Sequence, residues 1–168
     1  MNDLRLVLVC GLPGAGKTTR ARAIVRSRRA LYLNADDWVL GLRKSLVDYE
    51  FRVVLQDCLL GHAREVLRCG LSVVLEFGSW SRAERENIRQ AAVQAHATTE
   101  LHFLDAPLAE LVQRVRARGG PDAEVLASTV LLQHSARFER PSEEEIALFD
   151  HYFGPDDPWP PSALRAAQ

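Results

Sequence analysis

Residues 11–18 read Gly-Leu-Pro-Gly-Ala-Gly-Lys-Thr, which matches the phosphate-binding pattern G-x-x-x-x-G-K-[ST] at every fixed position. A nearly continuous apolar run at residues 4–10 precedes this segment, and a helical pattern from Thr18 to about Arg28 follows it. Such a run suits a strand that is buried on both faces of a parallel sheet. The stretch therefore predicts the strand, loop and helix of a P-loop nucleotide-binding fold.

Each residue type in this loop has a physical reason. Glycines let successive backbone N–H groups turn toward one point, and the helix that begins near Thr18 adds the positive end of its dipole. Lys17 can bridge the β- and γ-phosphates of ATP, and the Thr18 hydroxyl can coordinate Mg²⁺. ATP and Mg²⁺ are therefore the expected cofactors. The expected nucleotide-binding residues are Gly11, Pro13, Gly14, Ala15, Gly16, Lys17, Thr18 and Thr19.

Apolar runs alternate with amphipathic segments along the rest of the chain. Further strands are predicted at residues 30–34, 71–75, 100–105 and 149–153, the last as a short edge strand. Helices are predicted at residues 50–68, 82–96, 108–118 and 123–137, and a shorter one after Ser142. Gly119-Gly120-Pro121 separates two of these helices. This alternation predicts an α/β fold with three layers and a parallel sheet of about five strands.

Composition and charge narrow the class of protein. The 168 residues fit one domain, and a net charge of -1 argues against an extended surface for nucleic acid or anionic membranes. No stretch approaches the roughly 18 apolar residues of a membrane span. Cys10 ends an apolar run, whereas Cys58 and His62 lie on the apolar face of the long predicted helix. We expect all three to be packed in the core and the protein to be cytoplasmic.

An acidic pair follows the second predicted strand. A P-loop alone does not separate GTPases, motor ATPases and kinases, but the chain has no N-K-x-D segment for guanine and is too short for an AAA+ module with its helical lid domain. Asp36 and Asp37 stand where a parallel sheet binds its ligands. A carboxylate there can accept the proton of an attacking hydroxyl. We expect one of the pair to cap the next helix and the other to be catalytic.

The predicted helix at residues 108–118 carries three arginines. Arg114 and Arg118 share one flank of this helix, and Arg116 points to the other. Two guanidinium groups before a Gly-Gly-Pro break are typical of a lid that closes over phosphates and stabilises the transferring group. The alternative is a solvated basic face, which the helix dipole also favours near a helix C-terminus.

Four segments together resemble a known family. They are Gly-Leu-Pro-Gly-Ala-Gly-Lys-Thr-Thr-Arg-Ala, Leu-Asn-Ala-Asp-Asp-Trp, Val-Val-Leu-Glu-Phe-Gly-Ser-Trp-Ser-Arg-Ala-Glu-Arg and Leu-Asp-Ala-Pro-Leu-Ala-Glu-Leu. Over about residues 4–145 the chain is similar to the "predicted kinase" P-loop family AAA_33, which is related to zeta toxins, chloramphenicol phosphotransferase and polynucleotide 5′-kinase domains. The resemblance implies that Asp36 is the general base and that the arginine helix is a lid.

Two positions depart from that family's pattern. The third predicted strand ends in Glu76, where the family usually has Asp. The resemblance implies that Glu76 either holds Mg²⁺ through a water molecule or orders the P-loop. Val39 stands where polynucleotide kinases carry an arginine for the acceptor phosphate. This second departure argues against a nucleic-acid partner.

These observations predict a kinase that transfers the γ-phosphoryl group of ATP to a hydroxyl of a small molecule. Its kinase domain is expected over residues 1–154 and a Pro-rich tail over 155–168. A polynucleotide 5′-hydroxyl or nucleotide-sugar kinase is one alternative, and an ATP-binding or ATPase switch, which needs no base, is another. The expected catalytic residues are Lys17, Asp36, Arg114 and Arg118, and the expected acceptor pocket is formed by Asp37, Trp38, Trp80 and Arg82.

Overall fold

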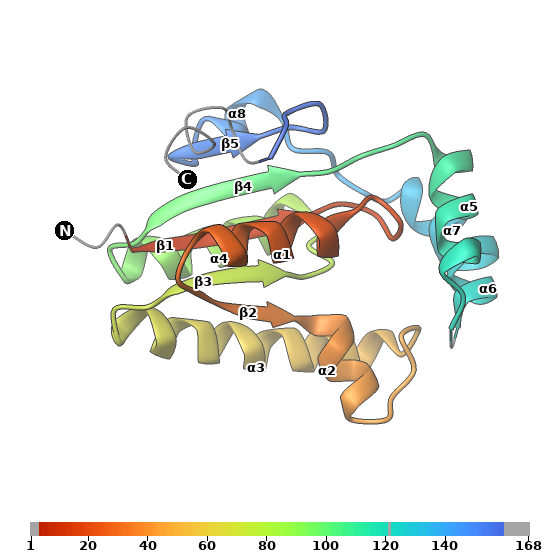
Figure 1. The fold of residues 1–168 in the computed structure, drawn as a ribbon, viewed down its shortest axis with the longest axis horizontal. Helices are drawn as coiled ribbons and strands as arrows, with labels where there is room; N and C mark the ends of the chain where they lie inside the picture. Colours follow the sequence, from red (N-terminus) through yellow and green to blue (C-terminus); the bar gives the residue numbers. More distant parts are fainter. Residues whose placement is uncertain (1–3, 121, 160–168) are drawn as a thin grey trace.

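The computed structural model describes residues 4–120 and 122–159 of the chain. Their centre is a parallel sheet of five strands in the order β2-β3-β1-β4-β5 (Figure 1). The strands are β1 (Arg5–Cys10), β2 (Ala30–Asn34), β3 (Ser72–Glu76), β4 (Thr98–Phe103) and β5 (His151–Phe153). The predicted α/β fold is confirmed, including the short edge strand beside β4.

Helices cover both faces of this sheet, so the central strand β1 is almost inaccessible to solvent. The helix α1 (Lys17–Ser27) packs over one face, and α3 (Tyr49–Arg68) and α4 (Arg82–Gln94) pack over the other (Figure 1). Leu8 of β1 lies in register between Leu75 and Leu101 of its two neighbours, and all three are fully buried. The apolar run of β1 follows from this double coverage.

Further helical segments stand beyond the carboxyl ends of the strands (Figure 1). They are α2 (Ala35–Gly41), α5 (Leu108–Arg118), α6 (Ala123–Val125), η1 (Leu126–Val130) and α7 (Leu131–Ser135), while α8 (Glu143–Ile146) lies near β5. The helix predicted over residues 123–137 thus contains a π-helical turn at η1. Pro121, in the predicted break before it, lies outside the described residues.

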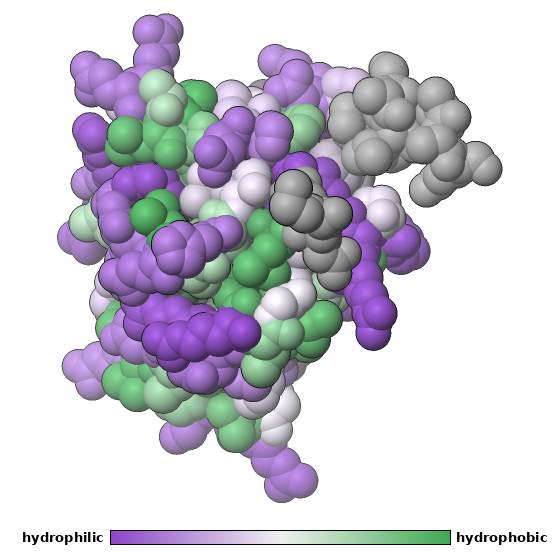
Figure 2. Space-filling model, turned by 90° about the vertical axis from the view of Figure 1, so that its left-hand side faces the viewer, coloured by the Kyte–Doolittle hydropathy of each residue, from purple (hydrophilic) through white to green (hydrophobic). Residues whose placement is uncertain are grey.

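The opposite end of the molecule presents hydrophilic and hydrophobic side chains interspersed (Figure 2). Of the predicted tail, residues 155–158 are exposed and Trp159 packs back on the sheet: its ring lies edge-on to His102, with the centroids 5.0 Å apart. Residues 160–168 lie outside the part of the chain that the structure describes. None of the described helices is long and apolar enough to span a bilayer.

The long helix α3 buries a narrower face than its apolar pattern predicts. Its buried residues are Leu55, Leu59, Leu60, Ala63 and Leu67. Cys58 and His62 are exposed, so the prediction that they pack in the core is wrong, whereas Cys10 is buried as expected. The apolar stripe is wider than the surface that the sheet and α4 cover, and its outer edge therefore faces solvent.

Candidate active site

The P-loop runs from the end of β1 to the start of α1. Gly14 and Gly16 have φ angles of 84° and 94°, which glycine adopts without strain. Gly16 precedes α1 directly, no side chain caps this helix, and its first turn contains no acidic residue. The backbone N–H groups of that turn are therefore available to an anion, and the helix dipole favours one.

Two glycines also allow close approaches around the loop. A Cβ atom at Gly11 would lie 2.2 Å from the carbonyl oxygen of Leu104, just after β4. A Cβ atom at Gly14 would lie 2.8 Å from the carbonyl oxygen of Leu111 on α5. Gly14 thus lets the arginine-bearing helix rest directly against the P-loop.

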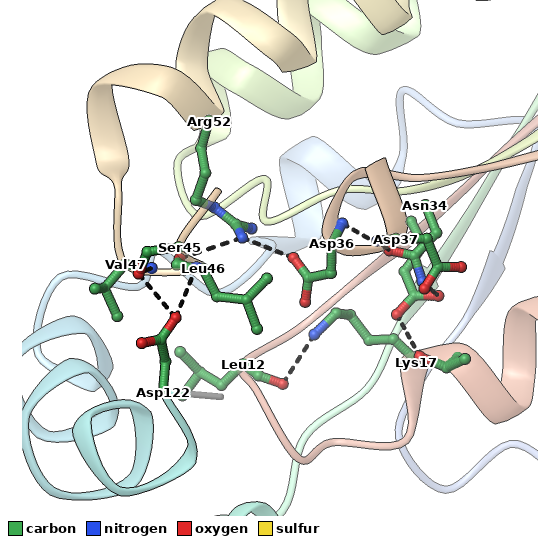
Figure 3. A network of polar contacts seen from close by, with 12 residues as sticks. Leu12, Lys17, Asn34, Asp36, Asp37, Ser45, Leu46, Val47, Arg52 and Asp122 are labelled. Carbon is green, nitrogen blue, oxygen red and sulfur yellow. Dashed lines mark hydrogen bonds and ion pairs between the residues drawn. The ribbon is translucent and has the colours of Figure 1, made fainter. Parts of the chain in front are cut away.

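Lys17 is held inside the P-loop (Figure 3). Its Nζ donates a hydrogen bond to the carbonyl oxygen of Leu12 at 3.1 Å. Burial lowers the pKa of Lys17, while the nearby carboxylates of Glu76 and Asp36 oppose that effect. Because no described carboxylate forms a salt bridge with Lys17, its ammonium group is oriented without being neutralised.

Thr18 and Glu76 lie together at the start of α1. The Thr18 hydroxyl donates to Glu76 Oε1 at 2.7 Å, and Glu76 is only 7% exposed. The other carboxylate oxygen accepts from Asn34 Nδ2 at 3.2 Å and from the Tyr32 hydroxyl. Burial, reinforced by the hydrogen bond to Glu76, raises the pKa of Tyr32, so its hydroxyl remains a neutral donor.

This pair of side chains fits the requirements of Mg²⁺. A hydroxyl and a carboxylate are the oxygen ligands that Mg²⁺ prefers, and Mg²⁺ keeps several water molecules as its remaining ligands. Thr18 and Glu76 would hold the ion beside the P-loop, directly or through one of those waters. Within the described residues, no cluster of three or more His, Cys, Asp or Glu side chains forms a separate metal site.

Asn34, and neither aspartate of the acidic pair, caps α2. Its Oδ1 accepts hydrogen bonds from the backbone N–H groups of Asp36 at 2.8 Å and Asp37 at 3.4 Å. The prediction that one of the two aspartates is the cap is therefore wrong. Asn34 has the extended backbone of an N-cap because it ends β2. The helix α2 therefore begins at Ala35, ahead of the acidic pair, and both carboxylates stay free of capping.

Asp36 pairs with Arg52 from the first turn of α3 (Figure 3). Arg52 Nη1 donates to Asp36 Oδ1 at 2.7 Å, and the same nitrogen lies 3.5 Å from the carbonyl oxygen of Leu46. The Asp36 side chain is 46% exposed, whereas that of Arg52 is 15% exposed. Sequence reasoning missed Arg52, because nothing in the local pattern of α3 distinguishes it from other helix-surface arginines.

A single cavity of about 570 Å³ joins these groups. Of the predicted nucleotide-binding residues, all but Gly11 and Ala15 line it, and those two are buried beneath the loop. Its charged lining comprises Lys17, Arg22, Asp36, Asp37, Arg52, Glu76, Arg114 and Arg118. Its apolar walls include Leu40, Leu46, Val47, Phe77, Trp80, Leu126 and Val130.

Two predicted pocket residues do not reach this cavity. Trp38 and Arg82 are absent from its described lining, and Trp38 is 45% exposed on α2. The Arg82 guanidinium lies 3.9 Å from the Glu144 carboxylate, and its backbone N–H donates to Glu139. Trp80 and Asp37 do line the cavity, so the structure brings together half of the predicted acceptor pocket.

The three arginines of α5 separate as helical geometry predicts. Arg114 and Arg118 line the cavity, and Arg114 Nη1 lies 3.4 Å from the carbonyl oxygen of Gly14. Arg116 points away and forms an ion pair with Glu124 at 2.8 Å. The first two guanidinium groups therefore stand beside the phosphate-binding loop.

Solved structures share this fold. A proposed kinase from Chloroflexus aurantiacus is 25% identical with a TM-score of 0.60, over 76% of this chain and 77% of that one. A sugar kinase from Janibacter sp. HTCC2649 is 20% identical with a TM-score of 0.64, over 98% and 91% of the two chains. The APS kinase of Mycobacterium tuberculosis, in complex with AMPPNP and APS, is 19% identical with a TM-score of 0.64, over 99% and 96%.

These likenesses show a P-loop kinase fold. No curated protein matches the sequence significantly. A family model described as an AAA domain, AAA_33, matches residues 6–141, which is most of the chain. The chain therefore belongs to the AAA_33 family of P-loop proteins.

Proposed function

We propose that this protein is a kinase that transfers the γ-phosphoryl group of Mg-ATP to a hydroxyl of a small molecule. One observation carries the proposal: Asp36 lines the same cavity as Lys17 and Thr18. A nucleotide seated in the P-loop would present its γ-phosphate toward this carboxylate. An acceptor hydroxyl placed between the two would then have a base on one side and phosphorus on the other.

The proposed step is an in-line displacement. The acceptor oxygen bonds to the γ-phosphorus while the bond from that phosphorus to the β,γ-bridging oxygen breaks. The hydroxyl proton passes to Asp36, and ADP leaves with the electron pair of the broken bond. Mg²⁺, where bound, supplies charge neutralisation between the β- and γ-phosphates.

The remaining charged groups have complementary roles. The N–H groups of the P-loop and Lys17 bind the phosphates, and Thr18 with Glu76 would hold Mg²⁺. Arg114 and Arg118 line the cavity from α5 and would stabilise charge on the transferring group. Arg22, which sequence reasoning missed, adds positive charge one helical turn beyond Thr18.

The acceptor side of the cavity supports a small alcohol. Its walls combine the charged groups with apolar side chains that include Leu40, Leu46 and Trp80. Such a cavity, with a volume of about 570 Å³, suits a compact molecule more than a polymer. Val39, at the position where polynucleotide kinases carry an arginine, is fully buried in the core. A different observation favours the alternative of a phosphorylated or nucleic-acid acceptor: Arg52 brings a guanidinium to the same wall from α3.

The decisive experiment is phosphoryl transfer from labelled ATP into a pooled library of metabolites and antibiotics, read as a mass shift. Lys17→Ala is the control, because it removes the phosphate-binding ammonium group while leaving the fold intact. We expect transfer by the wild type and a loss of about 10²-fold or more in the variant. Absence of adenine-nucleotide binding to the folded wild type, measured by calorimetry, would refute the proposal.

Two further measurements separate the alternatives. Phosphorylation of a 5′-hydroxyl oligonucleotide that falls steeply with added salt would indicate a polynucleotide kinase. ATP hydrolysis that no alcohol competes with, and that persists in Asp36→Asn, would indicate a switch rather than a kinase.

A further inference from the structure

We propose that Asp122 and Arg52 form a positioning relay, through which docking of the arginine-bearing segment α5–α6 orients the base Asp36. The inference rests on the proposed function, since it assigns Asp36 that role. It concerns residues that are distant in sequence and come from three separate elements. The relay consists of two contacts. In the first, Asp122 binds the loop at residues 44–48. In the second, this loop contacts Arg52, which in turn binds Asp36.

The first contact joins the arginine-bearing segment to the acceptor side of the cavity (Figure 3). Asp122 precedes α6, and its Oδ2 accepts from the Ser45 hydroxyl at 2.8 Å and from the Leu46 backbone N–H at 2.9 Å. Ser45 and Leu46 lie in the loop between α2 and α3. One carboxylate oxygen therefore fixes both a side chain and a main-chain group of that loop.

The second contact runs from this loop to the base. The Leu46 carbonyl oxygen lies 3.5 Å from Arg52 Nη1, which donates to Asp36 Oδ1 at 2.7 Å. Asp36 Oδ2 accepts no hydrogen bond from any described residue. Arg52 thus occupies one carboxylate oxygen and leaves the other for the hydroxyl proton, a geometry that a freely rotating side chain would hold only part of the time.

Two glycines follow the arginines of α5 in the sequence and precede Asp122. Gly119 and Gly120 have φ angles of 63° and 92°, and nothing lies within 4 Å of a Cβ placed on either. Asp122 itself has a φ of 62°. Because α5 also rests on the P-loop at Gly14, docking of this segment brings Arg114 to the phosphates and Asp122 to the loop at the same time.

The first test uses variants that keep the backbone geometry. Asp122→Gly removes the carboxylate without strain, since glycine adopts a φ of 62° freely. With the acceptor that the library screen identifies, we expect kcat to fall about tenfold and the Kd for Mg-ATP to change less than about twofold. Asp122→Asn keeps an acceptor oxygen and should restore part of the loss. His96→Gly, another residue of positive φ at the turn after α4, is the matched control.

A double-mutant cycle tests whether the two residues act together. Arg52→Gln alone should lower kcat about 30-fold, because Asp36 loses its orienting partner. If the relay exists, adding Asp122→Gly to Arg52→Gln lowers kcat by much less than the tenfold expected for Asp122→Gly in the wild type. If the two losses in kcat multiply in the double variant, the relay is overturned. It is also overturned if Asp122→Asn recovers none of the kcat lost in Asp122→Gly.

Hydrogen exchange tests the relay without turnover. In the presence of Mg-ADP, Asp122→Gly should speed amide exchange at residues 44–48 and at the start of α2, and His96→Gly should not. Unchanged exchange at both places would overturn the relay even in an active kinase. Faster exchange in a protein that transfers no phosphate to any alcohol would instead support the relay and refute the proposed function.

Discussion

Two buried glutamates, on neighbouring parts of one sheet, have opposite surroundings. Glu100 of β4 is 1% exposed and accepts from the guanidinium groups of Arg5 at 3.0 Å and Arg28 at 2.8 Å. Glu76 of β3 is 7% exposed and accepts only from the neutral donors Thr18, Tyr32 and Asn34 among the described residues. The charge of Glu100 is balanced within the protein, whereas that of Glu76 lacks a directly paired cation. A buried carboxylate is costly without one, which is the condition that favours Mg²⁺ beside Glu76.

His102 completes the balanced cluster. Its Nδ1 lies 3.2 Å from Arg20 Nη1, and because arginine only donates, Nδ1 accepts and Nε2 carries the proton. Nε2 then donates to Glu100 at 2.7 Å. Burial lowers the pKa of His102, which agrees with a neutral ring, and Trp159 and Phe153 pack against that ring. Both carboxylate oxygens of Glu100 and both ring nitrogens of His102 thus have fixed partners, so the cluster stabilises the fold.

The largest expected effect is a difference in the free energy of unfolding between variants of Glu100 and of Glu76. Glu100→Ala leaves Arg5 and Arg28 without their shared carboxylate and should lower the free energy of unfolding by about 3 kcal/mol. Glu76→Gln keeps one acceptor oxygen for Tyr32 and Asn34, and its amide NH2 can donate to the Thr18 hydroxyl, which also accepts. The variant also removes an unbalanced charge, so stability should fall by less than about 1 kcal/mol. Urea denaturation monitored by circular dichroism measures both. Glu76→Gln should instead raise the Mg²⁺ concentration needed for ATP binding, and a large stability loss in this variant would contradict the comparison.

A second effect concerns turnover. Asp36→Asn keeps the shape of the side chain but cannot accept the hydroxyl proton, so turnover should fall about 10²-fold or more, with ATP affinity almost unchanged. Steady-state kinetics and calorimetry on the same preparation check both parts. Asp37→Asn is the matched control on the adjacent residue. A greater loss in the control would move the base to Asp37.

The smallest expected effect is a pH dependence of stability. Burial alone would raise the pKa of Glu100, but hydrogen bonds from His102 and Arg28 outweigh it and bring the pKa to about 2, below the ordinary 4.5. The contribution of Glu100 is therefore complete above pH 4.5 and is lost as the pH falls toward 2. Between pH 7 and pH 4 this amounts to about 1 kcal/mol. Denaturation curves of the wild type and Glu100→Gln over this range should converge as the pH falls, and parallel curves would contradict the assignment.

Local patterns predicted most of the fold. The alternation of apolar runs and amphipathic segments gave the strands and their order along the chain, and the motif at residues 11–18 located the phosphate site. Ser81 and Glu84, at the S-x-x-E spacing, form a capping box at the start of α4. These features depend on residues close in sequence, where periodicity and capping rules apply.

Contacts between distant elements could not be predicted in this way. Arg52 reaches Asp36 only because α3 begins beside α2, and Glu100 meets Arg5 only because β4 lies next to β1. The direction of Trp38 depends on where α2 starts, and that depends on Asn34 acting as its cap. The sequence did contain this last signal, since asparagine is a strong N-cap residue at the end of a strand.

The order of the strands has a consequence for how the protein is made. Leu6 of β1 pairs with Val73 of β3 on one side and with Thr99 of β4 on the other, so β1 gains both neighbours only after the intervening residues have been synthesised. Pairing between such distant segments slows folding, because a long loop must close before the contact is gained. On the ribosome, the P-loop therefore emerges before the strands and the helix that complete the nucleotide site. The nucleotide site is assembled only after α5 has been translated, when β3, β4 and α5 can close around the P-loop.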